Sequence, residues 1–230
     1  MELSVRSHGL TALGPLHQAF ATLRGWHAML GAGLLGALAS LAIAPLHLSV
    51  ALLVSFTGLV WMIDGARGMT RWGRAVFARG WAFGYFLIGM YWTAEPFLVE
   101  PEKHLIFIWM PLFLMPAGMA LIWGAAMAFA AAFWSASPSR IFVLSIAFAL
   151  GELGRGHLFG GFPWNLAGTT WLAGGALSQM AAIGGVYWLT LLTVFIMATP
   201  AALVDTRDLC IAIGRMLPAL IAVVAFSGAW

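Results

Sequence analysis

Residues 28–63, AMLGAGLLGALASLAIAPLHLSVALLVSFTGLVWMI, contain no Asp, Glu, Lys or Arg. As a single helix they would be about 54 Å long at 1.5 Å per residue, whereas the hydrocarbon core of a bilayer is about 30 Å thick. The segment APLH (44–47) interrupts the run near its middle, because proline cannot continue a helix interior. The stretch therefore predicts a transmembrane hairpin, with spans at about 24–44 and 46–63.

The composition of the whole chain agrees with this prediction. Of its 230 residues, 62% are hydrophobic and 8% are charged, whereas a soluble domain usually has about 25% charged residues. A chain with so few charges cannot cover a water-exposed surface, so the class is an integral membrane protein. The formal net charge of +3 comes with no basic segment interleaved with aromatics, so nucleic acid is not expected as a partner.

The remaining apolar segments complete an all-α, polytopic helix bundle of about seven spans. Residues 1–23 are expected to form a tail, and residues 24–230 a transmembrane domain. After the first hairpin, the expected spans are 76–94, 105–134, 140–153, 174–199 and 210–230. Tryptophans near the ends of these spans are interpreted as interfacial anchors: Trp26, Trp61, Trp72, Trp92, Trp134, Trp164, Trp171 and Trp230.

The loops indicate the orientation. Nine of the 11 basic residues fall in the tail and in the loops that follow the second, fourth and sixth spans. The other side has Lys103 and Arg155 together with an acidic loop, EPFLVEPEKH (95–104), which its X-Pro steps predict to be extended or turned. The positive-inside rule then places the N-terminus inside and the C-terminus outside.

The segment GELGRGHLFGGFPWNLAG (151–168) concentrates charges and glycines between two apolar stretches. Adjacent glycines and Pro163 argue against a continuous helix. Irregular backbone at membrane depth is tolerated where protein or a water-filled cavity covers it. The segment is therefore predicted to be an outward-facing loop that lines a cavity; a plain packed turn is the alternative.

Glu152 and Arg155 are three residues apart, so on a helix they share one face and can pair. The functional interpretation is a substrate portal in which Arg155 meets an anionic phosphate while Glu152 fixes its side chain. The alternative is an ion pair that caps the fifth span. The candidate portal residues are Glu152, Arg155, Gly161, Phe162, Pro163, Trp164 and Asn165.

The same segment resembles the signature of bacterial apolipoprotein N-acyltransferases, in which an acidic residue and an Arg-Gly step precede Gly-Phe-Pro-Trp. Three further stretches resemble other spans of the family: LGALASLAIAPLHL (35–48), GYFLIGMYWTAEPFLVEPEKHLIFIWMPLFLMP (84–116) and ALSQMAAIGGVYWLTLLTVFI (176–196). The chain departs from the family pattern where Leu153–Gly154 replaces Trp-Leu and where Gly160 replaces a common Thr.

The resemblance implies acyl transfer from a phospholipid, through a cysteine thioester, to the N-terminal diacylglyceryl-cysteine of a lipoprotein in the bacterial inner membrane. In the family, a Glu-Lys-Cys set on a nitrilase-like domain performs this step. Lys103, the one lysine, and Cys210, the one cysteine, are expected on opposite sides of the membrane. No catalytic residue, metal site or cofactor is therefore assigned to this chain.

Two functions remain open at this point. The first is the membrane part of an apolipoprotein N-acyltransferase, truncated before its catalytic domain, with phospholipid, a lipoprotein precursor and, as one alternative, a separate nitrilase-like chain as partners. The second is a non-catalytic membrane protein that binds lipid or a partner chain, or a decayed gene product.

Overall fold

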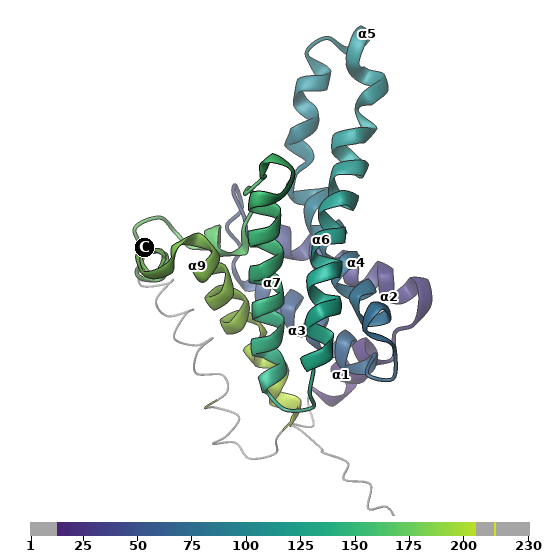
Figure 1. Cartoon of the computed structure of the whole chain (residues 1–230), viewed down its shortest axis with the longest axis vertical. Coiled ribbons are helices and arrows are strands. Elements are labelled where there is room, and N and C mark those ends of the chain that lie inside the picture. Colours follow the sequence, from purple (N-terminus) through teal and green to yellow (C-terminus); the bar gives the residue numbers. More distant parts are fainter. Residues whose placement is uncertain (1–12, 206–213, 215–230) are drawn as a thin grey trace, which may run out of the picture.

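The computed structural model describes residues 13–205 and Gly214, and this part of the chain is built from helices and loops (Figure 1). The longer helices are α1 (Gly14–Ala21), α2 (Gly25–Ser40), α3 (Val50–Gly65), α4 (Arg71–Gly89), α6 (Met115–Ala130), α7 (Ser139–His157) and α9 (Ala181–Ala198). The shorter helical segments are η1 (Tyr91–Leu98), α5 (Pro101–His104), η2 (Leu105–Phe107), η3 (Met110–Leu114), η4 (Ala131–Phe133), η5 (Leu158–Gly160), η6 (Ala167–Thr170), α8 (Ala176–Gln179) and η7 (Thr199–Asp205). The all-α prediction is confirmed for the described residues.

The first hairpin forms where the charge-free run predicts it. Helix α2 ends at Ser40, α3 begins at Val50, and the Ala44–Pro45 peptide bond between them is cis. The Leu48 amide donates to the Leu41 carbonyl at 2.9 Å and closes the turn. The turn also contacts a distant part of the chain, because the Thr170 hydroxyl donates to the Ala42 carbonyl at 2.7 Å.

Helices α2 and α4 pack so closely that glycine is required in the contact. A Cβ atom added at Gly84 would overlap the backbone of Gly33, and one at Gly36 would overlap the backbone of Trp81. Gly80 and Gly84 of α4 have the small-xxx-small spacing that lets membrane helices approach each other closely. Of the second small-xxx-small pair, Gly156 touches the Tyr187 hydroxyl of α9, whereas Gly160 has open space around it.

Aromatic rings fill the centre of the bundle between α3, α4 and α7. Trp81 stacks on Phe56 and on Tyr85, with ring centroids 5.1 and 5.0 Å apart, and Phe148 packs edge-on against Trp81 at 5.0 Å. The buried Ser55 hydroxyl accepts from the Trp81 indole at 2.7 Å and donates to the Leu35 carbonyl of α2 at 2.6 Å. Such a satisfied polar contact links three helices without leaving a buried group unpaired.

Three described helical stretches are long and apolar enough to cross a membrane: Pro101–Phe133, Ser139–Gly160 and Ala181–Asp205. Val50–Gly65 is a shorter apolar helix. Helices α2 and α4 coincide with two further expected spans, and the expected span 210–230 lies outside the described residues except for Gly214. The part of the expected tail that is described forms α1, which packs on α3.

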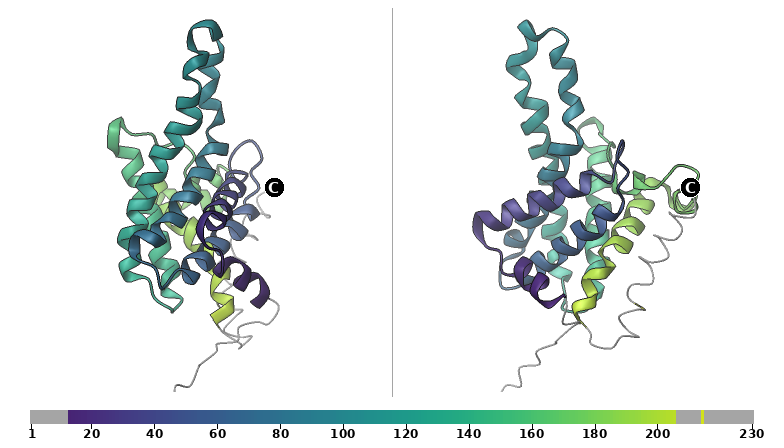
Figure 2. Two further views of the ribbon diagram at one scale, coloured as in Figure 1. Left: turned by 90° about the vertical axis from the view of Figure 1, so that its right-hand side faces the viewer. Right: turned by 180° about the vertical axis from the view of Figure 1, so that it is seen from behind.

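The segment from η1 to the start of α6 projects beyond the rest of the bundle, with α5 at its tip (Figures 1 and 2). The expectation that residues 95–104 are non-helical is wrong for 95–98 and 101–104, which lie in η1 and α5, whereas Val99 and Glu100 form a turn between them. Pro101 is the first residue of α5, where a missing N–H leaves no hydrogen bond unmade. The charged side chains of residues 95–104 are exposed, and Lys103 pairs with Glu100 at 2.6 Å.

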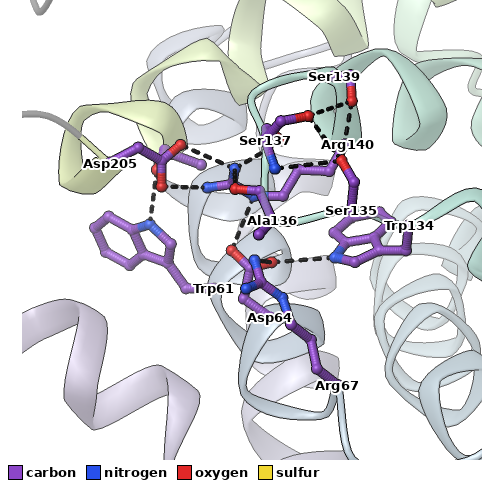
Figure 3. A network of polar contacts seen from close by, with 11 residues as sticks. Trp61, Asp64, Arg67, Trp134, Ser135, Ala136, Ser137, Ser139, Arg140 and Asp205 are labelled. Carbon is purple, nitrogen blue, oxygen red and sulfur yellow. Dashed lines mark hydrogen bonds and ion pairs between the residues drawn. The ribbon is translucent and has the colours of Figure 1, made fainter. Parts of the chain in front are cut away.

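At the other end of the bundle, a buried arginine joins three segments (Figure 3). The Arg140 side chain at the start of α7 has an exposed fraction of 0%. It donates from Nε to Asp64 at 2.9 Å and from Nη1 and Nη2 to the two carboxylate oxygens of Asp205 at 2.8 and 2.9 Å. Asp64 also accepts from Arg67 at 2.8 Å and from the Trp134 indole at 3.0 Å.

This cluster brings together the end of α3, the start of α7 and the end of η7. The count of basic residues assigns these three helix ends to one side of the membrane. Arg24, before α2, adds a hydrogen bond to the Gly65 carbonyl at 2.9 Å. Two of the tryptophans interpreted as interfacial anchors are instead buried in protein, namely Trp61 at 4% and Trp171 at 6% exposure. The Trp61 indole donates to the Ala201 carbonyl at 3.2 Å, so these rings stabilise the bundle.

Candidate functional site

Helix α7 includes the first part of the glycine-rich segment, residues 151–157. Its last residue is His157, and η5 and a loop follow. Four residues here adopt positive φ: Phe159 at 54°, Gly160 at 89°, Gly161 at 76° and Asn165 at 55°. Glycine takes this conformation without steric cost, and the prediction that the segment is not a continuous helix is confirmed.

The last two turns of α7 contain a buried ion pair. Glu152 and Arg155 are exposed by 2% and 1%. The Arg155 Nε donates to Glu152 Oε2 at 3.1 Å, and Nη2 donates to the same oxygen. The pairing predicted from their spacing of three residues is confirmed. Burial favours it, because an unpaired charge in this position would carry a large desolvation cost.

The third nitrogen of the guanidinium, Nη1, binds the loop. Arg155 Nη1 donates to the carbonyl oxygens of Phe162 and of Trp164. In the reverse direction, the Phe162 amide donates to the Arg155 carbonyl at 3.0 Å. The side chain and the backbone of one residue therefore hold the returning loop against the end of α7.

Two aromatic rings enclose the guanidinium from other helices. The Arg155 Cζ atom lies 5.1 Å from the ring centroid of Phe86 in α4 and 5.3 Å from that of Trp123 in α6. Both distances are in the range of cation–π interactions. Arg155 is thus buried and bonded inside the bundle, and it does not present its guanidinium at the surface.

The rest of the loop is bonded to α4 and α9. The Asn165 side-chain amide donates to the Gly89 carbonyl, and the Tyr85 hydroxyl donates to the Asn165 carbonyl at 2.9 Å. The Gly168 amide donates to the Thr190 hydroxyl at 3.2 Å, in a contact that has no room for a Cβ atom. Tyr85 is a residue that the sequence analysis missed, since nothing in α4 marks it as a partner of position 165.

The outer surface of the loop is apolar and exposed. Phe159 is 98% exposed and Trp164 is 58% exposed, while Phe162 is half-buried against the core. The Trp164 ring packs edge-on against Trp92, with centroids 5.7 Å apart. Phe159 was missed by the sequence analysis, although an aromatic residue directly before two glycines is a signal that could have identified it. We call the exposed residues Phe159, Pro163 and Trp164 the loop rim.

The described residues offer no catalytic set around this loop. Among them, no cluster of three or more His, Cys, Asp or Glu side chains could hold a metal ion. His157 contacts the Leu153 carbonyl at 2.8 Å through Nδ1, and its ring lies 5.8 Å from that of Tyr187. Lys103 belongs to α5, which forms the projecting tip of the bundle (Figure 1), and Cys210 lies outside the described residues.

The fold and the loop together define a class: an all-helical membrane domain whose fifth expected span ends in an arginine-held Gly-Phe-Pro-Trp loop. A model of the apolipoprotein N-acyltransferase N-terminal domain matches residues 35–199. The chain therefore belongs to the apolipoprotein N-acyltransferase family.

Curated relatives named apolipoprotein N-acyltransferase agree with this assignment. The chain is 42% identical to one from Caulobacter vibrioides over 183 residues, which are 77% of this chain and 34% of the relative. It is 38% identical to one from Brucella melitensis biotype 1 over 218 residues, which are 90% of this chain and 40% of the relative. The chain thus spans little more than a third of the relatives that it matches.

Proposed function

We propose that this chain is the membrane domain of an enzyme that transfers an acyl group from a phospholipid to the N-terminal cysteine of a lipoprotein precursor. The family match supports this substrate class. One observation supports this role for the domain: Arg155 binds the carbonyls of Phe162 and Trp164. This clamp holds an irregular loop in one shape and leaves the loop rim exposed. Neither the family match nor the similarity to the relatives gives support to a separate nitrilase-like chain.

Within this proposal, the loop is the wall of a portal through which lipid substrates reach the reaction site. The loop rim contacts acyl chains, and Gly161, Phe162 and Asn165 give the loop its shape. Glu152 and Arg155 are positioning residues, because their polar groups are already bonded to each other and to the loop. This role replaces the direct phosphate contact expected for Arg155, since its guanidinium is buried.

A chimera tests the activity. This chain replaces the matching N-terminal third of the Caulobacter vibrioides relative, and the product is incubated with phospholipid and a diacylated lipopeptide. We expect mass spectrometry to detect the triacylated product with the chimera but not with this chain alone, because its one lysine and its one cysteine are expected on opposite sides of the membrane. Product from this chain alone that disappears in Cys210→Ala would overturn the second expectation, and an inactive, folded chimera would overturn the first.

The portal has its own test in the chimera. Arg155→Lys is expected to lower turnover per folded molecule and to raise KM for phospholipid, whereas Trp164→Phe is expected to change both less. If the ion pair of Glu152 and Arg155 only caps α7, Arg155→Lys lowers thermal stability and leaves the turnover per folded molecule and the KM for phospholipid unchanged. The measurement therefore separates a portal from a structural cap.

We further propose a multi-pass location in the bacterial inner membrane, with the N-terminus inside and the C-terminus outside. The excess of basic residues on one set of loops supports this orientation. A reporter that is active only outside the cytoplasm, fused after Trp230, is expected to be active. An inactive fusion, together with an active cytoplasmic reporter at the same point, would reverse the orientation.

A further inference from the structure

An apolar groove of about 810 Å³ runs along the surface between α2, α4 and α6. Its floor includes Gly33, Gly80 and Gly84, and at Gly84 the backbone of α2 is too close for a side chain. Exposed leucines form its walls, among them Leu34 from α2 and Leu121 from α6. The volume lies within the range of small-molecule sites, about 300–1,000 Å³.

One charged residue lines this groove, and it is Arg79 of α4. The aliphatic part of its side chain packs on Gly124 of α6, with Cβ, Cγ and Cδ 3.4–3.8 Å from the position that a Cβ of Gly124 would take. The part of the chain from residue 13 to 205 gives its guanidinium no carboxylate and no hydrogen-bond acceptor. Arg79 is exposed, so the group is open to a ligand.

The position of Arg79 fixes the direction of a ligand in the groove. Gly80 contacts Met29 near the start of α2, and Gly89 contacts Ser40 at its end, so α2 and α4 run parallel. Arg79 therefore lies at the groove end nearer the buried Arg140 cluster, and the apolar lining extends from there toward Ile88. This is the end of the bundle opposite the loop rim.

We infer that this groove binds an acyl chain of an anionic phospholipid whose phosphate pairs with Arg79. In a bilayer, an apolar wall alone gives no preference for one apolar neighbour over another, because lipid tails are as apolar as leucine. The guanidinium supplies the preference. Its planar donors fit a phosphate, and its positive charge favours a headgroup with a net negative charge over a zwitterionic one, as in basic pockets between membrane helices. This lipid is a resident of the bundle and not the acyl donor of the proposed reaction.

Gly118 of α6 offers a variant that fills the groove without disturbing the packing. It lines the groove, and a Cβ added there meets no atom within 4 Å. Leucine at this position also has higher helix propensity than glycine. The matched control is Ala125→Leu, which adds apolar volume to an exposed position of the same helix outside the groove. The charge is tested with Arg79→Gln. Its matched control is Arg71→Gln, because Arg71 is an exposed arginine of α4 that does not line the groove.

The test uses the full chain in phosphatidylcholine vesicles that contain a trace of phosphatidylglycerol with a photoreactive diazirine in its acyl chain. After irradiation, labelled peptides are identified by mass spectrometry. We expect labelling in α2, α4 and α6 that excess unlabelled phosphatidylglycerol suppresses and excess phosphatidylcholine does not. Arg79→Gln is expected to lower it about tenfold, as the loss of one charge-assisted hydrogen bond would, and Gly118→Leu to abolish it, with both controls unchanged.

Three results would overturn the inference: labelling that survives both Arg79→Gln and Gly118→Leu, labelling that both lipids suppress equally, or crosslinks to a second copy of the chain in place of lipid. Size-exclusion elution and circular dichroism monitor folding of each variant. Gly118→Leu keeps the test decisive if Arg79→Gln fails to fold. Because acyl transfer is not measured, failure here leaves the proposed function untouched.

Discussion

Replacing Arg155 by lysine tests the clamp that shapes the loop. Arg155 donates two hydrogen bonds to Glu152 and one each to the carbonyls of Phe162 and Trp164, from three nitrogens that lie in one plane and point in different directions. A lysine ammonium has its three donors on one nitrogen. It keeps the charge and can stay with Glu152, but it cannot reach the loop carbonyls at the same time.

The expected cost follows from the two lost bonds. Hydrogen bonds to charged groups contribute roughly 1.5–3 kcal/mol each. The retained ion pair avoids the larger penalty of an unpaired buried charge, about 3–5 kcal/mol. We therefore expect Arg155→Lys to lower the free energy of holding the loop closed by about 3 kcal/mol, which corresponds to roughly a 100-fold rise in the open population.

Hydrogen exchange measures this quantity directly. The Phe162 amide is bonded to the Arg155 carbonyl, so peptides covering residues 158–166 should exchange about 100-fold faster in Arg155→Lys. The control is Trp164→Phe, which changes an exposed ring and leaves the carbonyl bonds in place. Unchanged exchange in this peptide, with an unchanged melting temperature, would refute the clamp.

Three further predictions concern the rest of the bundle. Gly84→Ala should destabilise by about 3 kcal/mol, because its Cβ would overlap backbone that cannot move aside, whereas Gly118→Ala, in open space, should stabilise by up to about 1 kcal/mol; urea unfolding in mild detergent compares them. Asp205→Asn should cost about 2 kcal/mol, since it weakens the fork to the buried Arg140 while Asp64 still pairs with it, and equal stability would contradict this network. Arg67→Gln, at an ion pair whose arginine is 44% exposed, should cost less than about 1 kcal/mol in the same assay.

The sequence predicts the parts of this structure that depend on local rules. A charge-free run longer than a bilayer must fold back, and the hairpin at Ala44–Pro45 does so. The spacing of Glu152 and Arg155 predicts their pairing, because it depends only on helix geometry. The glycines and Pro163 predict a break in α7 for the same reason.

The sequence does not predict contacts between distant segments. Arg140 pairs with Asp64 and Asp205, which are 76 and 65 residues away, and no periodicity connects them. The carbonyl oxygens bound by Arg155 belong to backbone, which leaves no mark on residue identity. For this reason the sequence interpretation assigns Arg155 a contact with a phosphate, whereas the structure shows it buried in α7 and bonded to the loop.

Helix α7 has a buried arginine cluster at each end, Arg140 in its first turn and Arg155 in its last. A rise of about 22 Å along the helix separates them. Arg140 is bonded to Asp64 and Asp205, and Arg155 is bonded to the loop and lies against the rings of Phe86 in α4 and Trp123 in α6. The helix can therefore neither slide along its axis nor rotate without breaking charged bonds at both ends. When the thickness of the surrounding bilayer changes, the bundle must respond by tilting as a unit or by deforming the lipid, and the height of the loop relative to the rest of the domain stays constant.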